Sequence, residues 1–200
     1  MIVAMFDPKS ITVVSGLPRS GTSMMMQMLK AGGLDTLIDE ARVPDDDNPR
    51  GYFEFEPTKK TRRDTSWVDL AGGKVVKLVH LLLLDLPADR SYRVIMMRRQ
   101  MSEVLISQEK MLTRQGKKGA SLSSDKLAAV FHQQMEDVLI HLREQSCFEF
   151  LEIQYADVVA DAAEQADAGR RRRFQPGKIV WNLPARGYRV LRVRPRHYLQ

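Results

Sequence analysis

The residues from Gly16 to Ser23 have the types and spacing of a turn that binds a phosphate-like anion. The sequence here is GLPRSGTS, in which four residues separate Gly16 from Gly21 and two hydroxyl side chains follow. A turn of this kind between a strand and a helix points several backbone N–H groups at one position, where the positive end of the helix adds to the field. The side chains that add donors are those of Arg19, Ser20, Thr22 and Ser23. The pattern predicts an anion site, and the alternative is a tight turn without a ligand.

The residues around this turn limit which anion it holds. A nucleotide hydrolase places a Lys on the β- and γ-phosphates and an Asp near Mg²⁺ at a neighbouring strand end. This chain has Thr22 where that Lys would stand, and the run YRVIMMRR ends in Arg98 and Arg99 instead of an acid. We therefore expect no γ-phosphate and no metal, and a 5′-phosphate or phosphosulfate group as the ligand.

GLPRSGTS resembles the 5′-phosphosulfate loop of sulfotransferases that use 3′-phosphoadenosine 5′-phosphosulfate (PAPS), in the Pro-Arg-Ser-Gly-Thr form of the protein-tyrosine and carbohydrate branches. That family has an Arg at a strand end and a Ser eight residues later on the next helix, which together grip the 3′-phosphate of the nucleotide. Arg99 and Ser107 match this pair, whereas Arg98 is nine residues from Ser107 and is expected to face the other way. The resemblance implies PAPS as co-substrate and nucleotide binding by Arg19, Ser20, Gly21, Thr22, Ser23, Arg99 and Ser107.

The resemblance extends over roughly residues 10–165. Within it, the run IQYADVVAD at 153–161 resembles the family's Tyr-x-Asp-Leu-Val element, for which we expect a structural role.

Sulfuryl transfer needs a base that takes the acceptor proton. By resemblance to the tyrosylprotein branch, this base is Glu40, which lies 21 residues after Arg19 and two before Arg42. A solvated ion pair between Glu40 and Arg42 is the structural alternative. The other candidate bases are Glu54, Glu56 and His80.

The transfer also needs cations that stabilise charge on the bridging oxygen, and the candidates are Arg19 and Lys77. Lys77 lies inside the apolar run VVKLV, where an unpaired charge would be costly. A ligand or partner near Lys77 is therefore favoured over a plain surface lysine.

The elements that must position these residues alternate between strand and helix. Apolar and alternating runs predict strands at 10–16, 73–79, 91–98 and 147–155. Helical spacing predicts helices at 20–33, 58–70, 101–112, 125–142 and 156–168. Ser102 is expected to cap the third of these helices.

Because hairpin signals are absent, this alternation predicts an α/β fold of the P-loop nucleoside-triphosphate-hydrolase kind. It is a three-layer sandwich with a mostly parallel central sheet of about four to five strands. Ligands bind such sheets beyond the carboxyl ends of the strands. The loops expected there are those at 15–20, 79–80 and 98–99.

Charge divides the chain into two parts. Residues 1–168 hold 21 Lys and Arg against 25 Asp and Glu, whereas residues 169–200 hold ten Lys and Arg and no acid. We therefore expect a sulfotransferase-like domain at 1–168 and a basic extension at 169–200. Because the first part is mildly acidic, the net charge of +6 does not indicate a nucleic-acid groove.

Three further features exclude other classes of protein. No apolar run approaches the roughly 20 residues that span a bilayer, and the N-terminus lacks the charged region and cleavage site of a signal peptide. The single Cys147 excludes an internal disulfide and fits a reducing compartment. We therefore expect a cytoplasmic protein.

Together these features predict a sulfotransferase that moves a sulfuryl group from PAPS to a hydroxyl or amine of a small-molecule or carbohydrate acceptor. No metal, nucleic-acid or membrane partner is expected. The alternatives are a non-catalytic nucleotide-binding domain and a small-molecule kinase, which would bind Mg-ATP. The loops at 34–57 and 114–124 are expected to shape the acceptor pocket, but neither the acceptor nor the oligomeric state follows from the sequence.

Overall fold

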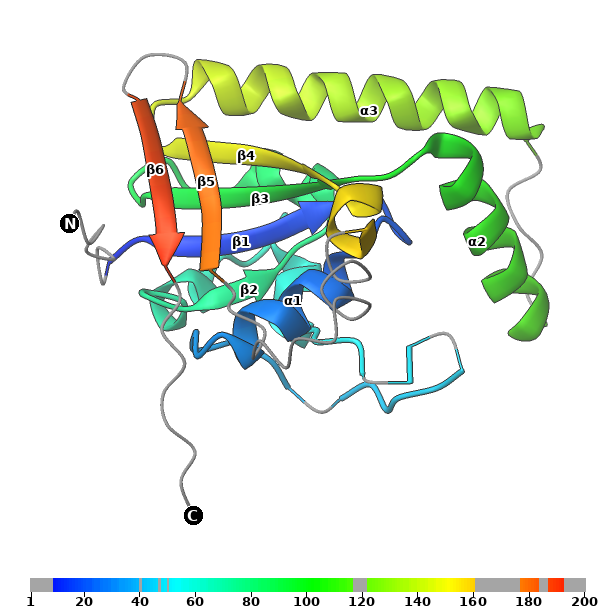
Figure 1. Ribbon diagram of the computed structural model, residues 1–200, viewed down its shortest axis with the longest axis horizontal. Helices are drawn as coiled ribbons and strands as arrows, with labels where there is room; N and C mark the ends of the chain where they lie inside the picture. Colours follow the sequence, from blue (N-terminus) through cyan, green and yellow to red (C-terminus); the bar gives the residue numbers. More distant parts are fainter. Residues whose placement is uncertain are drawn as a thin grey trace.

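A four-stranded, all-parallel sheet forms the centre of this α/β protein (Figure 1). The computed structural model describes residues 9–39, 41–46, 48–49, 51–116 and 122–160, together with the backbone of 177–183 and 187–192. The strands of the sheet are β1 (Ile11–Gly16), β2 (Val75–Lys77), β3 (Tyr92–Arg98) and β4 (Phe148–Gln154). Their order is β2-β1-β3-β4, with every pair parallel. The predicted parallel sheet is therefore confirmed.

Successive side chains of the strands enter two apolar layers, one on each face of the sheet. Val13 packs in the layer beneath α3 (Ser124–Glu144), together with Met135 and Leu142 of that helix. Its neighbour Val14 packs in the layer beneath α1 (Thr22–Ala31), with other members that include Val75, Ile95, Met25, Met26 and Leu29. Each fully buried side chain of this size contributes about 1.5–3 kcal/mol relative to exposure. Burial on both faces explains the successive apolar residues of β1 and β3, whereas β4, at the end of this sheet, alternates.

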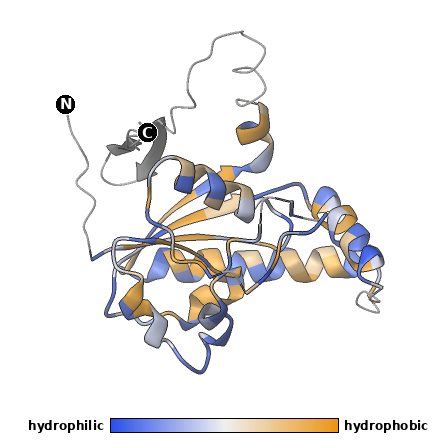
Figure 2. Cartoon of the chain, turned by 90° about the horizontal axis from the view of Figure 1, so that it is seen from below, coloured by the Kyte–Doolittle hydropathy of each residue, from blue (hydrophilic) through white to orange (hydrophobic). Residues whose placement is uncertain are grey.

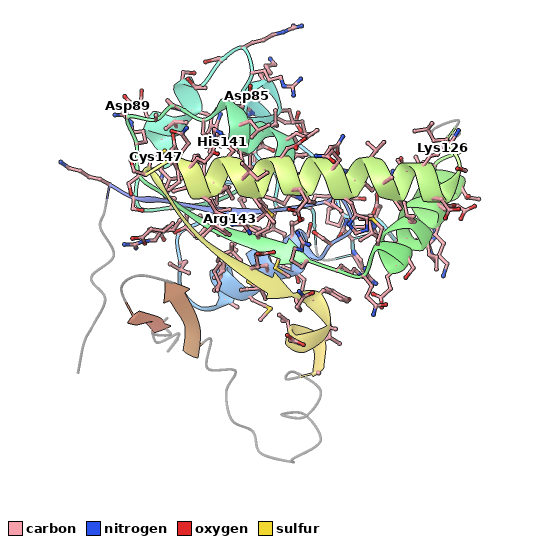
Figure 3. All side chains as sticks on the ribbon, turned by 90° about the horizontal axis from the view of Figure 1, so that it is seen from above. Asp85, Asp89, Lys126, His141, Arg143 and Cys147 are labelled. Carbon is pink, nitrogen blue, oxygen red and sulfur yellow. The ribbon has the colours of Figure 1, made fainter. Side chains whose placement is uncertain are left out.

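The long helix α3 packs on one face of the sheet, in an apolar layer that it shares with Trp67, Val68 and Leu83. Figure 3 shows it running along the strands, with Lys126 near its beginning and His141 near its end. Ser123 caps the helix by accepting a hydrogen bond from the Lys126 N–H, and the hydrophobic side of the helix faces the strands (Figure 2). The predicted helix at 125–142 therefore forms and is slightly longer.

Helix α2 (Met101–Arg114) starts directly after β3, and its predicted cap is wrong. The N-cap residue is Gln100, whose carbonyl accepts from the Val104 N–H, and no side chain caps the helix. Ser102 lies one residue inside the helix. The strand ends at Arg98, so the chain turns into the helix before it reaches Ser102.

The predicted helix at 58–70 is also wrong. The segment forms two short 3-10 helices, η1 (Glu56–Lys60) and η2 (Ser66–Leu70). The Thr58 and Thr61 hydroxyls donate to carbonyls three residues earlier, and Asp64 accepts from the Ser66 N–H. Such local bonds compete with a continuous helix. A third 3-10 helix, η3 (His80–Asp85), follows β2.

The end of the chain contains a hairpin that the sequence analysis missed. Strands β5 (Gly177–Leu183) and β6 (Gly187–Arg192) pair antiparallel, so the expectation of no hairpin is wrong. The signal was the pair Pro184 and Gly187 between two β-rich runs. Of the helix predicted at 156–168, residues 155–160 are helical, and the rest lies outside the described residues. The division at residue 168 stays a prediction.

Gly21, at the end of the loop before α1, should be hard to replace. Its φ is 99°, and an added Cβ would lie 2.6 Å from Cδ2 of Tyr155. Gly116 is a matched control, because its φ is 64° and an added Cβ would meet no atom within 4 Å. Left-handed backbone alone costs a non-glycine residue about 1–2 kcal/mol.

We therefore expect Gly21→Ala to lower the free energy of unfolding clearly more than Gly116→Ala, as measured by chemical denaturation. Equal losses in the two variants would contradict the close packing of Tyr155 on this loop.

Candidate functional site

The candidate site lies where the connections of the sheet diverge. From β1 the chain passes through α1 to β2 on one side, and from β3 it passes through α2 and α3 to β4 on the other. The adjacent ends of β1 and β3 therefore border the crevice at which open α/β sheets bind ligands. The parallel pairing places Gly16 opposite Met97, one residue before the end of β3. The loop that follows β1 and the arginines that follow β3 thus meet at one point.

The loop from Gly16 to Gly21 has a backbone that few other sequences allow. An added Cβ on Gly16 would lie 2.5 Å from the Ser20 Oγ and 2.7 Å from the Met97 carbonyl. Arg19 adopts a φ of 69°, a left-handed conformation that is uncommon for a residue other than glycine. Such backbone persists where the surroundings hold it, and it is concentrated at functional sites.

The beginning of α1 is open to an anion. Its N-cap is Gly21, no side chain caps it, and its first turn contains no acid. The first N–H groups of the helix therefore remain available, and the helix dipole favours negative charge there. Ser20 is 1 % exposed, and its Oγ makes no hydrogen bond in the described part of the chain. This buried hydroxyl adds a donor without a protein partner beside the same loop.

Arg19, Arg99 and Ser107 come together from three separate elements. The Arg19 Nε donates to the Ser107 Oγ over 2.9 Å, which ties the loop to α2. The Arg99 Nη1 donates to the Arg19 carbonyl over 3.0 Å, and its Nε pairs with Glu103 at 2.8 Å. Arg98 instead pairs with Glu152 on β4 at 3.5 Å. The residues matched to the 5′- and 3′-phosphate motifs thus form one connected cluster.

Tyr155 also belongs to this cluster, although the sequence analysis gave its segment only a structural role. Its ring lies against Gly21, and the Arg99 guanidinium carbon lies 4.3 Å from the ring centroid. A cation over an aromatic ring is attracted to its face. The signal for Tyr155 was its position directly after β4, at the same edge of the sheet as the loop.

A pocket of about 450 Å³ opens beside the loop. Of the predicted nucleotide-binding residues, those that line it are Arg19, Gly21, Thr22 and Ser23. Ser20, Arg99 and Ser107 do not line it, and Arg99 and Ser107 instead hydrogen-bond to Arg19 of the loop. The opposite wall comes from the segment at 42–59 and from the end of β2, and its charged members are Arg42, Glu54, Lys59 and Lys77.

Lys77 is held at this wall by three groups. Its side chain is 13 % exposed, and its Nζ lies 3.3 Å from the Ser23 Oγ and 3.3 Å from the Glu54 Oε1. It also donates to the Tyr52 carbonyl, which accepts a second bond from the Ser23 hydroxyl at 3.1 Å. The sequence predicted a partner for Lys77, and the partner is this group of acceptors.

Glu54 is the centre of a four-residue ion cluster, which we call the Glu54 cluster and which consists of Glu54, Arg42, Lys59 and Lys77. Arg42 lies 3.5 Å from Oε1, and Lys59 lies 3.1 Å from Oε2. Burial by itself would raise the pKa of Glu54, but Lys77 and Lys59 outweigh it and lower that pKa below its ordinary value. For Lys77, burial outweighs the attraction of Glu54, so its pKa is lowered. The pKa shift of Glu54 thus comes from its cations, whereas that of Lys77 comes from burial, which Glu54 offsets only in part.

The candidate bases differ in where they lie. Glu40 lies outside the described residues, so its role stays a prediction. Its neighbour Asp39 connects the same segment to the pocket wall, since the Asp39 N–H donates to the Glu54 carbonyl over 2.9 Å. Glu54 lines the pocket but is held by cations. Glu56 does not line the pocket, and it pairs with Lys59.

His80 is the remaining candidate base, and it faces the interior. It is 2 % exposed, and its Nε2 lies 3.1 Å from the Gln134 Oε1 of α3. Burial lowers the pKa of His80, and the hydrogen bonds with Gln134 and with the Gly16 backbone raise it by less. A neutral, buried imidazole beside α3 does not line the pocket and cannot meet an acceptor there without rearrangement.

The described residues contain no group of three or more His, Cys, Asp or Glu side chains arranged to hold a metal ion. Within the same residues, no helix combines the length and the apolar character needed to cross a membrane.

A second cavity, of about 750 Å³, lies between α2 and α3. None of the predicted site residues lines it. Leu122 and Ser124, from the loop expected to shape the acceptor pocket, line this cavity and not the one beside the phosphate loop.

No protein-family model matches the sequence, and no curated protein matches it at a significant level. The functional assignment therefore rests on the residues and geometry of this chain.

The Glu54 cluster predicts an acid-sensitive contribution to stability. Because the pKa of Glu54 is lowered in the folded chain, its contribution is complete above the ordinary value of 4.5 and is lost as the pH falls through the lower folded value. Glu54→Gln leaves Lys77 buried without a counter-charge, and we expect it to reduce the free energy of unfolding by about 2–3 kcal/mol at neutral pH.

The matched control is Glu56→Gln, which removes one exposed ion pair and should change the free energy of unfolding by about 0–1 kcal/mol. Denaturant titrations from neutral to acid pH measure both variants. A Glu54→Gln deficit that stays constant as the pH falls below about 4 would contradict the account.

Proposed function

We propose that this chain is a PAPS-dependent sulfotransferase that transfers a sulfuryl group to a hydroxyl or amine of a small-molecule or carbohydrate acceptor. The observation that carries the proposal is the connected cluster of Arg19, Arg99 and Ser107 at the open beginning of α1. A 5′-phosphosulfate needs the N–H groups of such a turn, and a 3′-phosphate needs a cation and a hydroxyl nearby. The loop that contains Arg19 would supply the first, and Arg99 and Ser107, which lie 80 and 88 positions after Arg19, would supply the second.

The chemistry of the pocket suits an in-line transfer. The acceptor oxygen or nitrogen forms a bond to sulfur as the bond from sulfur to the bridging phosphate oxygen breaks. The acceptor proton passes to Glu40, the proposed base. The electron pair of the broken bond stays on the 5′-phosphate, where Arg19 and Lys77 are proposed to stabilise the charge.

A small-molecule kinase is less well supported by the same residues. Thr22 stands in the position of the phosphate-binding Lys, and Arg98 and Arg99 stand where an acid would hold Mg²⁺. A non-catalytic nucleotide-binding domain would use the same loop and the same cluster. Only a measurement of sulfuryl transfer distinguishes that alternative from the proposal.

The proposed 3′-phosphate contact predicts a ligand-specific effect of Arg99→Ala. Loss of a charge-assisted hydrogen bond costs about 1.5–3 kcal/mol, so the variant should bind 3′-phosphoadenosine 5′-phosphate (PAP) about 10- to 100-fold more weakly by calorimetry. Adenosine 5′-phosphosulfate lacks the 3′-phosphate, and its affinity should change little. Arg98→Ala is the control, because Arg98 pairs with Glu152 on β4. Equal losses for the two nucleotides would show that Arg99 acts only through the Arg19 carbonyl.

The proposed base predicts a separation of binding from turnover. Glu40→Gln should lower the rate of PAP release from PAPS, measured with a panel of hydroxyl and amine acceptors, by about 10²-fold or more, while PAP affinity stays the same. Glu56→Gln should leave both unchanged. A Glu40→Gln variant with normal turnover would exclude Glu40. A wild-type chain that binds PAP but transfers no sulfuryl group to any acceptor would favour the non-catalytic alternative.

A further inference from the structure

The proposed chemistry needs a charged Lys77, but the burial of this side chain disfavours the charge. Its ammonium is almost fully buried at the pocket wall, where an unpaired charge is costly and the group tends to lose its proton instead. A neutral Lys77 would neither attract the 5′-phosphosulfate nor stabilise the leaving oxygen. Something near Lys77 must therefore keep it charged before the anion arrives.

Glu54 is the group that meets this need. Of the described residues that line the pocket, it is the only acid. Its Oε1 lies 3.3 Å from the Lys77 Nζ, and its side chain is 17 % exposed. The other neighbours of Lys77 are the neutral acceptors Ser23 Oγ and Tyr52 carbonyl, so they cannot balance the charge.

The remaining charged groups around Lys77 act against it. Arg42 and Lys59 both reach the same carboxylate, and both lower the pKa of Lys77 further. The Tyr52 hydroxyl donates to the Asp45 carboxylate, at 2.7 Å from Oδ1 and 2.6 Å from Oδ2. The protonation of Lys77 thus depends on one carboxylate, which two other cations share.

The backbone around Glu54 fixes where this carboxylate points. The Glu54 carbonyl accepts from the Asp39 N–H, and the Asp39 carboxylate accepts from the Glu56 N–H over 2.6 Å. The Tyr52 carbonyl, two residues earlier, is bound to both Lys77 and Ser23. The segment is therefore fastened on both sides of Glu54, with Lys77 held within reach of Ser23 on the first turn of α1.

From this arrangement we propose that Glu54 is a positioning residue, which holds the Lys77 ammonium against the first turn of α1 so that a bound anion meets a charged lysine. The proposal rests on the proposed function, because it assumes that the loop binds the 5′ group of the nucleotide. It also gives Glu54 a role other than that of base. A carboxylate that holds three cations accepts a proton poorly.

The proposal predicts a change in the pH dependence of anion binding. In Glu54→Gln, Lys77 loses its counter-charge but keeps Arg42 and Lys59 as neighbours, so its pKa falls below that in the wild type. Below that pKa the ammonium is present and PAP binds. Above it Lys77 is neutral, so PAP affinity decreases as the pH rises.

The experiment is the affinity of PAP measured by calorimetry from about pH 6 to about pH 10 in the wild type and in Glu54→Gln. We expect the loss of affinity at alkaline pH to begin at a lower pH in Glu54→Gln, with at least about a tenfold deficit relative to the wild type where Lys77 is neutral. The double variant Glu54→Gln/Lys77→Arg should lose this alkaline decrease, because a guanidinium stays charged throughout the range. Circular dichroism and the unfolding midpoint at each pH establish that every sample is folded.

Parallel profiles for the wild type and Glu54→Gln would overturn the positioning role while leaving the proposed function intact. An alkaline decrease that persists in the double variant would also overturn it, because the titrating group would not be Lys77. If Glu54→Gln is too unstable to measure, Glu54→Asp, which shortens the side chain and keeps the charge, should show an intermediate profile, and a wild-type profile there would count against the proposal. A wild-type chain that binds no PAP at any pH would instead overturn the proposed function, and this inference with it.

Discussion

The candidate site depends on two hydrogen bonds that fasten the loop after β1. Arg19 donates from its side chain to Ser107 on α2, and it accepts at its carbonyl from Arg99 after β3. Arg19 has a left-handed backbone, so its conformation needs such support. With the loop held in this shape, the N–H groups at the beginning of α1 face one position.

The parallel sheet makes these bonds possible. Because β1 lies between β2 and β3, the ends of three strands deliver the loop, Lys77 and Arg99 to the same edge. Residues of the segment at 42–59 then form the second wall of the pocket, and this wall is attached through Lys77, Ser23 and the Tyr52 carbonyl. The cationic character of the pocket comes from Arg19, Arg42, Lys59 and Lys77, against the single described acid Glu54.

The parts of the site that could be predicted from the sequence are those fixed by local pattern and strand direction. The loop and Arg99 follow strands, Lys77 ends one and Ser107 lies on the helix after β3, so the direction of parallel strands places them together. The partners of Lys77 could not be predicted, since Glu54 and Tyr52 lie on an irregular segment without a repeating pattern. Tyr155 was missed because the contact between its ring and Gly21 depends on how β4 pairs with β3. The segment at 58–70 was misassigned because the bonds of Thr58, Thr61 and Asp64 are too local to appear in a hydrophobic period.

The central claim is that this site binds an adenosine nucleotide with phosphate groups at both its 3′ and 5′ positions, and binds it without a metal ion. A comparison of the unfolding midpoint of the wild-type chain with PAP and with Mg-ATP tests it most directly. The account predicts that PAP raises the midpoint in a concentration-dependent manner, in the presence or absence of a chelator, and that Mg-ATP raises it much less. Stabilisation by Mg-ATP that exceeds that by PAP, or that disappears with the chelator, would contradict it.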